Sequence, residues 1–558
     1  MITLQGKGVS AGVEIGKLYY YHRAVAEIKM YEIEDIEAEW QRFKSAQETA
    51  IGQLGELAEK TRAELGRAEA FLFETHQMLA EDLDYVESIE GIIKKERLNA
   101  ETAVLRTSEI FAKMFEGMDD EYMRGRAADV RDVSKRILDV LTGVVQGGID
   151  SDVPVIIAAD DLAPSETIQL DKAKVLGFAT SAGSEFSHTS ILARTMGIPA
   201  IVGLGDSLKE EFAEKIVIID GETGAFIVNP GEDITSRMLK KRDELIKKRE
   251  ALEQLKGKEN ITKDGKKIRI YCNIGEPEDV SSVLENDGGG IGLFRSEFLF
   301  LNNSRYPTED EQFEAYKKVL SDMNGKEVII RTCDIGADKQ MDYFELPKEE
   351  NPAMGLRALR VSLTRSDVFR TQLRALYRAS VYGKLGIMFP MIASVWEITE
   401  VKKFIEDVKQ ELKDEGIAYS EDVEIGAMIE TPAAAILSDR LAKEVDFFSC
   451  GTNDLTQYTL ACDRQNNGLG RFYDPHHPAV IRLIKMVCDN AHKNGIWVGI
   501  CGELGSDLEL TETFLAMGVD ELSVSPHAVL QLRNVVRNID TSLTSEKILA
   551  AIDADETI

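Results

Sequence analysis

The second half of the chain repeats one pattern eight times, a short apolar run that ends in polar residues. The runs are KIRIYCN, GGIGLFRSE, EVIIRTCD, LGIMFPMI, EIGAMIET, DFFSCGTND, WVGICGE and ELSVSP, and helical patterns separate most of them. Such runs in alternation with helices are typical of parallel strands in β/α units. Eight units over roughly 280 residues match a (β/α)8 TIM barrel, whose functional face lies at the carboxyl ends of its strands. We predict this barrel over residues 262–558.

Ionisable and polar side chains of both signs follow the apolar runs. They are Arg295, Glu297, Arg331, Asp334, Glu430, Asn453, Asp454, Cys501 and Glu503. Guanidinium groups bind phosphate and carboxylate groups in a bidentate manner, and Arg357 and Arg464 in neighbouring segments could join them. Glu430 and Asp454 are hard oxygen ligands suited to Mg²⁺, which usually takes one or two protein carboxylates. The alternative is that these charges form structural ion pairs at the rim of the barrel.

Cys501 directly follows the seventh apolar run, WVGI, so its thiol is expected to face the mouth of the barrel. A thiol is mostly protonated at neutral pH and can donate its proton to a carbanion or enolate. A buried structural cysteine is the alternative. The six cysteines all lie in the second half without a CxxC pair, which argues against a zinc site and against a disulfide framework.

The first half predicts an α/β domain that is interrupted by a helical bundle. Helix formers with apolar residues at three-and-four spacing dominate residues 31–144, whereas apolar runs and Gly-rich turns occupy residues 1–30 and 145–230. Residues 231–261 form a charged amphipathic stretch, which we interpret as a linker helix between the halves. The alternative is a helix that packs along its own domain.

His188 lies in the segment GSEFSHTSILAR, just before an apolar helical pattern. Ser187 can cap a helix that begins at His188, so a phosphate carried on the imidazole would lie near free backbone amides and the positive end of the helix dipole. Neutral imidazole is a competent nucleophile near pH 7. A hydrogen-bonded structural histidine is the alternative.

The net charge of the chain argues against nucleic acid as a partner. Lys plus Arg total 66 against 97 Asp plus Glu, which gives 66 − 97 = −31 and would repel the phosphates of a nucleic acid. No apolar run approaches the roughly 20 residues needed to cross a bilayer, and the first residues lack the layout of a signal peptide. We therefore expect a cytoplasmic protein that binds no nucleic acid and does not insert into membranes.

Several longer motifs resemble those of one family, enzyme I of the bacterial phosphoenolpyruvate-dependent sugar phosphotransferase system. RAADVRDV resembles its helical-domain signature, and SHTSILARTMGIPAIVG resembles its phosphohistidine segment. GIGLFRSEFLF, RTCDIGADK, NPAMGLRALR, IETPAA, CGTNDLTQYTLACDR and GICGELGSD resemble its phosphoenolpyruvate-binding set. The resemblance extends over essentially the whole chain.

The resemblance implies a role for each candidate residue. His188 would be the phosphorylated nucleophile, and Cys501 would protonate the enolate to give pyruvate. Phosphoenolpyruvate would be bound by Arg295, Arg331 and Arg464, with Asn453 assisting and Arg357 near the phosphate, while Glu430 and Asp454 would hold Mg²⁺. It also implies a homodimer formed through the barrel, and transfer of the phosphoryl group to the carrier HPr, which would dock on the helical subdomain with His76 in the docking surface.

The segment before His188 departs from the family, which usually reads Gly-Gly-Arg-Thr-Ser-His. Here Glu185 replaces the cation and Phe186 replaces the threonine. We expect Glu185 to face solvent, Ser184 or Ser187 to supply the hydroxyl, and Arg194 to supply positive charge. This departure motivates one alternative, a regulatory paralogue that binds HPr or phosphoenolpyruvate without efficient turnover.

A second alternative is a pyruvate phosphate dikinase or phosphoenolpyruvate synthase, which share similar histidine and barrel segments. It requires an additional ATP-binding domain, and the chain has neither a G-x-x-x-x-G-K-[ST] motif nor the residues to form such a domain.

Overall fold

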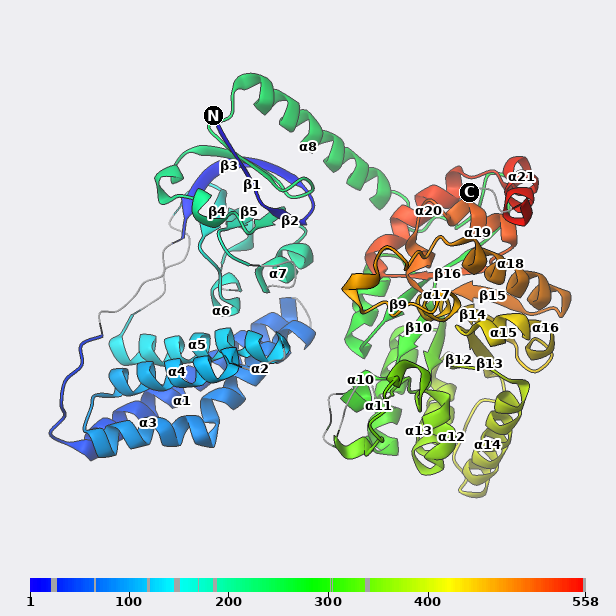
Figure 1. Ribbon diagram of the computed structural model, residues 1–558, viewed down its shortest axis with the longest axis horizontal. Coiled ribbons are helices and arrows are strands. Elements are labelled where there is room, and N and C mark those ends of the chain that lie inside the picture. Colours follow the sequence, from blue (N-terminus) through cyan, green and yellow to red (C-terminus); the bar gives the residue numbers. More distant parts are fainter. Residues whose placement is uncertain are drawn as a thin grey trace. The chain divides into compact units, whose positions relative to one another are not determined.

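The computed structural model forms two compact units, Met1–Arg249 and Glu250–Ile558 (Figure 1). It describes residues 1–21, 28–64, 67–117, 121–144, 151–168, 170–183, 188–301, 303, 305–336 and 342–554. No helix within these ranges is long and apolar enough to cross a membrane.

The first unit contains an antiparallel helical bundle. Its helices are α1 (Ile36–Glu64), α2 (Arg67–Glu81), α3 (Leu83–Glu96), α4 (Ala100–Glu116) and α5 (Glu121–Thr142). Asp82 starts α3 by accepting a hydrogen bond from the Tyr85 amide, which satisfies one of the free donors of the first turn. The fully buried Tyr85 lies 2.6 Å, oxygen to oxygen, from the Ser134 hydroxyl and so ties α3 to α5.

An eight-stranded mixed sheet forms the rest of this unit. Its strands are β1 (Ile2–Gln5), β2 (Lys7–Ser10), β3 (Val13–Tyr20), β4 (Val155–Ala159), β5 (Val175–Thr180), β6 (Ala200–Val202), β7 (Ile216–Asp220) and β8 (Ala225–Val228), in the order β1-β8-β7-β3-β4-β5-β6-β2. β4 pairs in parallel with β3, although the whole helical bundle separates them in the sequence. The bundle is therefore an insertion between two neighbouring strands, and the expected architecture is confirmed.

Two short helices position the segment that carries His188. α6 (Pro164–Thr167) and α7 (His188–Met196) follow β4 and β5, and His188 is the first residue of α7. Thr189 donates a hydrogen bond from its hydroxyl to the Leu162 carbonyl at 3.2 Å, which holds the start of α7 against the turn before α6. Ser165 on α6 donates to Asp132 on α5 at 2.7 Å and joins the α/β part to the bundle.

His76 lies inside the first unit rather than on its surface, so the expectation that it belongs to a docking surface is wrong. Its side chain is fully buried on α2, with Nε2 3.2 Å from Asp129 and Nδ1 3.7 Å from Asp132. A buried imidazole between two carboxylates is an internal polar contact of the bundle, and Asp132 is the same residue that binds Ser165.

The charged helix α8 (Glu232–Glu253) combines the two expected arrangements. Its first part packs on the sheet, since Met238 is buried against Val13, Ile218 and Ile227. Lys241 forms an ion pair with Asp220 at 2.8 Å on the same side. The boundary between the two units falls within the last turns of α8, so the helix also connects them.

The second unit is a closed barrel of eight parallel strands, as predicted. The strands are β9 (Arg269–Ile274), β10 (Ile291–Arg295), β11 (Glu327–Arg331), β12 (Lys384–Phe389), β13 (Glu424–Ile429), β14 (Phe447–Cys450), β15 (Trp497–Ile500) and β16 (Glu521–Val524). Each strand coincides with one of the eight apolar runs. In a closed barrel every strand is paired on both sides, so the carboxyl ends form one continuous rim.

The barrel is surrounded by helices (Figure 1). They are α9 (Val280–Glu285), α10 (Phe298–Leu301), α11 (Glu309–Asp322), α12 (Leu359–Thr364), α13 (Ser366–Ala379), α14 (Val395–Asp414), α15 (Pro432–Ile436), α16 (Ser438–Leu441), α17 (Thr452–Leu460), α18 (Pro478–Lys493), α19 (Thr511–Met517), α20 (Val529–Asn538) and α21 (Thr541–Ala554). Capping boxes begin α11, with Thr308 and Glu311, and α14, with Ser394 and Glu397.

The barrel interior encloses the carboxyl group of Glu521 on β16. The residue is 1 % exposed, and neither carboxyl oxygen has a hydrogen-bond partner among the described residues. Burial, with a further contribution from Glu327, raises the pKa of Glu521 well above its ordinary value, against a smaller opposite effect of Arg269. Burial therefore favours the protonated form of Glu521, because an isolated buried carboxylate is far more costly.

Replacing Glu521 with Gln is expected to stabilise the barrel increasingly as the pH rises. The unfolded chain releases this proton near pH 4.3, but the folded chain retains it, so wild-type stability is full below that pH and falls as the pH rises towards the folded pKa. The advantage of Glu521→Gln should grow by up to about 1.4 kcal/mol per pH unit in this window. Calorimetric melting of the full chain at pH 5, 6 and 7 measures it, and a constant difference would show that Glu521 is ionised.

Candidate functional site

A cavity of about 870 Å³ opens at the carboxyl ends of the barrel strands. Its lining includes all eight residues that the sequence analysis assigned to the barrel site, namely Arg295, Arg331, Arg357, Glu430, Asn453, Asp454, Arg464 and Cys501. These residues are spread over about two hundred positions of the sequence, so only the closed barrel places them together. The roles assigned to them remain predictions.

Arg331 and Arg295 end adjacent strands and pair in register. Arg295 is exposed to the cavity, whereas the buried Arg331 forms ion pairs with Glu297 at 3.1 Å and Asp334 at 3.0 Å. Burial alone would lower the pKa of Arg331, but Glu297, Asp334 and Glu430 together hold it above its ordinary range. The Arg331 Nε is buried without a hydrogen-bond partner among the described residues, while the residue as a whole lines the cavity.

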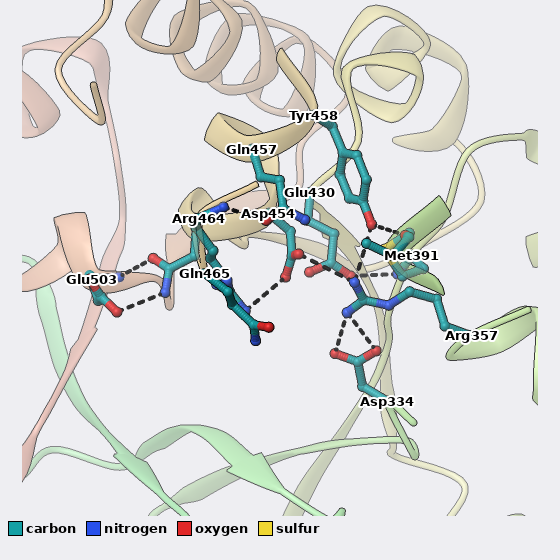
Figure 2. A network of polar contacts seen from close by, with 12 residues as sticks. Asp334, Arg357, Met391, Glu430, Asp454, Gln457, Tyr458, Arg464, Gln465 and Glu503 are labelled. Carbon is teal, nitrogen blue, oxygen red and sulfur yellow. Dashed lines mark hydrogen bonds and ion pairs between the residues drawn. The ribbon is translucent and has the colours of Figure 1, made fainter. Parts of the chain in front are cut away.

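Arg357 reaches the same cluster from the loop before α12 (Figure 2). One terminal nitrogen donates to both oxygens of Asp334, at 3.1 and 3.2 Å, and the other donates to Asp454 at 3.4 Å and Tyr458 at 3.1 Å. Ala358, the next residue, has a φ of +53°, a region that a residue with a Cβ rarely adopts. The loop is therefore strained at the point where it delivers the guanidinium group.

Glu430 follows β13 and is 1 % exposed. Its Oε1 accepts a hydrogen bond from the Met391 amide at 2.5 Å, which fixes the side chain (Figure 2). Burial raises the pKa of Glu430 to about 8, and the nearby Asp334 and Asp454 contribute, while Arg331 and Arg357 oppose them. The local field therefore disfavours another negative charge here and would favour a bound cation.

The first turn of α17 supplies Asn453 and Asp454. Asn453 donates to Glu503 at 3.1 Å and accepts from the Glu503 amide at 3.0 Å, which links the ends of β14 and β15. Asp454 is nearly buried and lies 3.9 Å from the Arg464 guanidinium. The backbone amide of Arg464 donates to Gln457, so α17 also positions the loop that carries Arg464 (Figure 2).

Cys501 lies at the floor of the cavity and is 3 % exposed. Its thiol points to the Cys450 carbonyl, with sulfur and oxygen 3.7 Å apart. Burial raises the pKa of Cys501 to about 12. Cys501 is thus a protonated thiol at neutral pH. A proton donor requires this form, whereas a nucleophile would require the thiolate.

The donor set fits a magnesium ion. Of the described lining residues, seven are carboxylic acids and four are arginines: Glu276, Glu297, Asp334, Glu430, Asp454, Asp463 and Glu503 against Arg295, Arg331, Arg357 and Arg464. The described residues contain no group of three or more His, Cys, Asp or Glu side chains arranged for a metal. Two carboxylates, Glu430 and Asp454, match what Mg²⁺ takes from a protein when substrate and water complete its shell.

The structure describes only part of the histidine segment. His188 begins α7, but residues 184–187 lie outside the described residues, and with them the expectations for Ser184, Glu185, Phe186 and Ser187. Arg194 on α7 donates a hydrogen bond to the Val9 carbonyl at 3.1 Å. Its proposed contribution of charge beside His188 stays a prediction.

Two residues that hold the arginines of the cavity were not singled out from the sequence. Tyr458 binds Arg357, and Gln457 binds the Arg464 backbone. Helical spacing could have identified Tyr458, because it lies one turn after Asp454 on α17. The same spacing rule applies to Gln457, which lies three residues after Asp454 on α17.

Three protein-family models match the chain. A model described as the PEP-binding domain of PEP-utilising enzymes matches residues 249–541, their N-terminal domain matches residues 5–126, and their mobile domain matches residues 152–224. The first of these alone covers more than half of the chain.

Curated relatives match over nearly the whole length. A phosphoenolpyruvate-protein phosphotransferase of Listeria innocua is 44 % identical over 540 residues, 97 % of this chain and 94 % of the relative. One from Staphylococcus aureus is 42 % identical over 552 residues, 99 % of this chain and 96 % of the relative. A solved structure titled as Enzyme I (nEIt) is 38 % identical and covers 43 % of this chain and 99 % of its own, with a TM-score of 0.38.

Proposed function

The chain belongs to the phosphoenolpyruvate-protein phosphotransferases, the enzyme I family, and we propose that it transfers the phosphoryl group of phosphoenolpyruvate to His188 and then to HPr. Pyruvate is the other product. The observation that carries the assignment of residues is the single cavity, which brings together arginines, paired carboxylates and a protonated thiol from eight separate positions.

The arginines bind the substrate. Phosphoenolpyruvate carries a carboxylate and a phosphate, and planar guanidinium groups bind both in a bidentate manner. Arg295, Arg331 and Arg464 take these groups, and Arg357 lies beside the phosphate. The existing ion pairs of Arg331 and Arg357 with Asp334 hold both side chains in place before substrate arrives, so little reorganisation accompanies binding.

Glu430 and Asp454 hold Mg²⁺, with Asn453 next to them on α17. The bound ion supplies positive charge that offsets the surplus of carboxylates in the lining and the charge of the substrate phosphate. The protein keeps Glu430 in position through the Met391 amide and keeps Asp454 in position through Arg357.

His188 accepts the phosphoryl group. Its imidazole attacks phosphorus, the bond to the enol oxygen breaks, and the electron pair of that bond leaves with the enolate of pyruvate. Cys501 then donates its proton to the methylene carbon of the enolate and becomes a thiolate. His188 belongs to the first unit and the cavity to the second, so the histidine domain has to move between the cavity and the carrier.

HPr docks on the helical subdomain, and the described helices offer a surface for it. Phe71, Met78 and Leu83 on α2 and at the start of α3 are 52, 65 and 76 % exposed. Phe71 and Met78 are seven residues apart and so share one face of α2, and exposed apolar patches are typical of protein interaction sites. Homodimerisation through the barrel and a cytoplasmic location belong to the same proposal and rest on family membership.

Intact-protein mass after incubation with phosphoenolpyruvate and Mg²⁺ tests the function. We expect an acid-labile phosphoryl adduct that requires Mg²⁺, disappears when HPr is added, and appears in step with pyruvate. Chelation of Mg²⁺ should stop its formation, because the carboxylate-rich cavity then lacks the neutralising charge. A protein that binds phosphoenolpyruvate and Mg²⁺ but forms no adduct would instead be the regulatory paralogue.

A further inference from the structure

The barrel makes room for the Glu521 carboxyl group with two glycines. A Cβ on Gly499 would lie 2.1 Å from Glu521 Oε2, and a Cβ on Gly292 would lie 2.3 Å from Glu521 Oε1. Real Cβ atoms do not come so close to oxygen, so no other residue fits at either position without moving the carboxyl group. Two strands therefore lack side chains where this acid lies.

The Glu521 carboxyl group lies against Gly499, two residues before Cys501. Gly499 lies on β15 and Cys501 directly follows that strand, and residues two apart along extended backbone face the same side at about 6.6 Å. Within this distance, one hydroxyl group can connect the two side chains.

Ser449 occupies the connecting position. It pairs in register with Gly499 on the neighbouring strand β14, so it lies beside the space that the Glu521 carboxyl group fills. Its hydroxyl also lies beside the Cys501 sulfur, where it lowers the pKa of Cys501 against the larger effect of burial. That hydroxyl forms no hydrogen bond of standard geometry with the described residues, so it is free to turn towards either neighbour.

Each turnover leaves Cys501 as a thiolate, because its thiol has given its proton to the enolate. This thiolate would line the cavity close enough to Glu430 for a negative charge on Glu430 to repel it. A nearby proton donor inside the barrel would neutralise it before product leaves.

We propose that Glu521 is that donor and returns a proton to Cys501 through the Ser449 hydroxyl. The carboxyl O–H bond of Glu521 breaks as its proton passes to the Ser449 oxygen, and the Ser449 hydroxyl proton passes to the Cys501 sulfur, so the thiol and the hydroxyl are both restored. Glu521 is left as a carboxylate. This inference rests on the proposed role of Cys501 as the proton donor to the enolate.

Glu521 regains its proton from solvent at the amino-terminal end of the barrel. Arg269 pairs with Glu521 in register, and its side chain is 41 % exposed. Arg269 and Glu327 are the charged groups that act on Glu521 there, and Glu327 is itself bound by Tyr271 at 2.8 Å and by Lys384 at 2.7 Å. The positive charge of Arg269 stabilises the carboxylate while it waits for a proton.

A comparison of the first turnover with later turnovers tests the relay. Full-length wild type, Glu521→Gln and Ser449→Ala are mixed rapidly with excess phosphoenolpyruvate, Mg²⁺ and HPr, and pyruvate is followed from the first turnover. Both variants start with a protonated Cys501, so we expect first turnovers within about twofold of wild type. Later turnovers should be slower by at least tenfold, and added small acids should restore them in part.

Glu397→Gln is the matched control, because it removes a buried carboxyl group of the same unit that is held by the Ala393 and Ser394 amides and lies outside the cavity lining. It should leave the ratio of first to later turnovers unchanged. Equal slowing of both phases in Glu521→Gln, or of neither, would overturn the relay. Absence of a first turnover in wild type would overturn the proposed function instead, so the two failures are distinguishable.

Discussion

Replacement of His188 by alanine is expected to abolish phosphorylation of the protein and transfer to HPr. Phosphoenolpyruvate and Mg²⁺ should still bind, because their ligands lie in the barrel and His188 lies in the other unit. The loss is complete rather than partial because no other group replaces the nucleophile that receives phosphorus. Intact-protein mass at neutral pH and after mild acid measures the adduct, and calorimetry measures binding of phosphoenolpyruvate to the same sample.

His492→Ala is a suitable control for this experiment. His492 is partly exposed on α18, where it forms an ion pair with Asp520 at 2.8 Å, and it lies outside the cavity lining. It should leave the adduct unchanged. An acid-labile adduct that persists in His188→Ala would contradict His188 as the nucleophile, whether or not HPr still became phosphorylated.

The barrel could be predicted from sequence because each of its strands is both apolar and short. A strand buried on both faces requires a continuous apolar run, so the eight runs mark the strands directly. Arg331 and Glu430 follow such runs, and the closed topology then requires them to share one rim.

The partners within the cavity could not be predicted in the same way. Both Arg331 and Arg357 bind Asp334, and this choice depends on loop conformation rather than on the order of strands. Arg357 comes from a loop in which the next residue, Ala358, adopts a positive φ, which nothing in the sequence NPAMGLRALR indicates. The alternative of ion pairs at the rim was therefore partly right, since these charges do pair with each other.

His76 illustrates a second limit of prediction from sequence. Helical periodicity places it on α2 but does not tell which face of α2 meets α5, so a buried residue was assigned to the surface. The same ambiguity applies to Met78 and Phe71, which are apolar and yet exposed. An apolar residue on the outside of a bundle is informative only after the packing is known.

Replacing Arg331 with leucine is expected to lower kcat/KM for phosphoenolpyruvate on the order of 10³-fold. Arg331 is buried with two carboxylates and lines the cavity, so the substrate loses a charge-assisted contact in a site of low dielectric. Loss of one partner from such a pair costs roughly 2–5 kcal/mol, and each 1.4 kcal/mol is tenfold. Pyruvate release coupled to HPr phosphorylation measures the rate, and calorimetric melting measures the stability of the barrel.

Arg533→Leu separates the effect of such a substitution on activity from its effect on stability. Arg533 on α20 is 2 % exposed and binds Asp287 and the Asn260 side chain, but it does not line the cavity. Both variants leave a carboxylate without its partner, so both should melt at lower temperature. Only Arg331→Leu should lose activity per folded molecule. If the two variants lost stability alike and both kept wild-type kinetics, Arg331 would be a structural ion-pair residue, and substrate binding would depend on Arg295, Arg357 and Arg464.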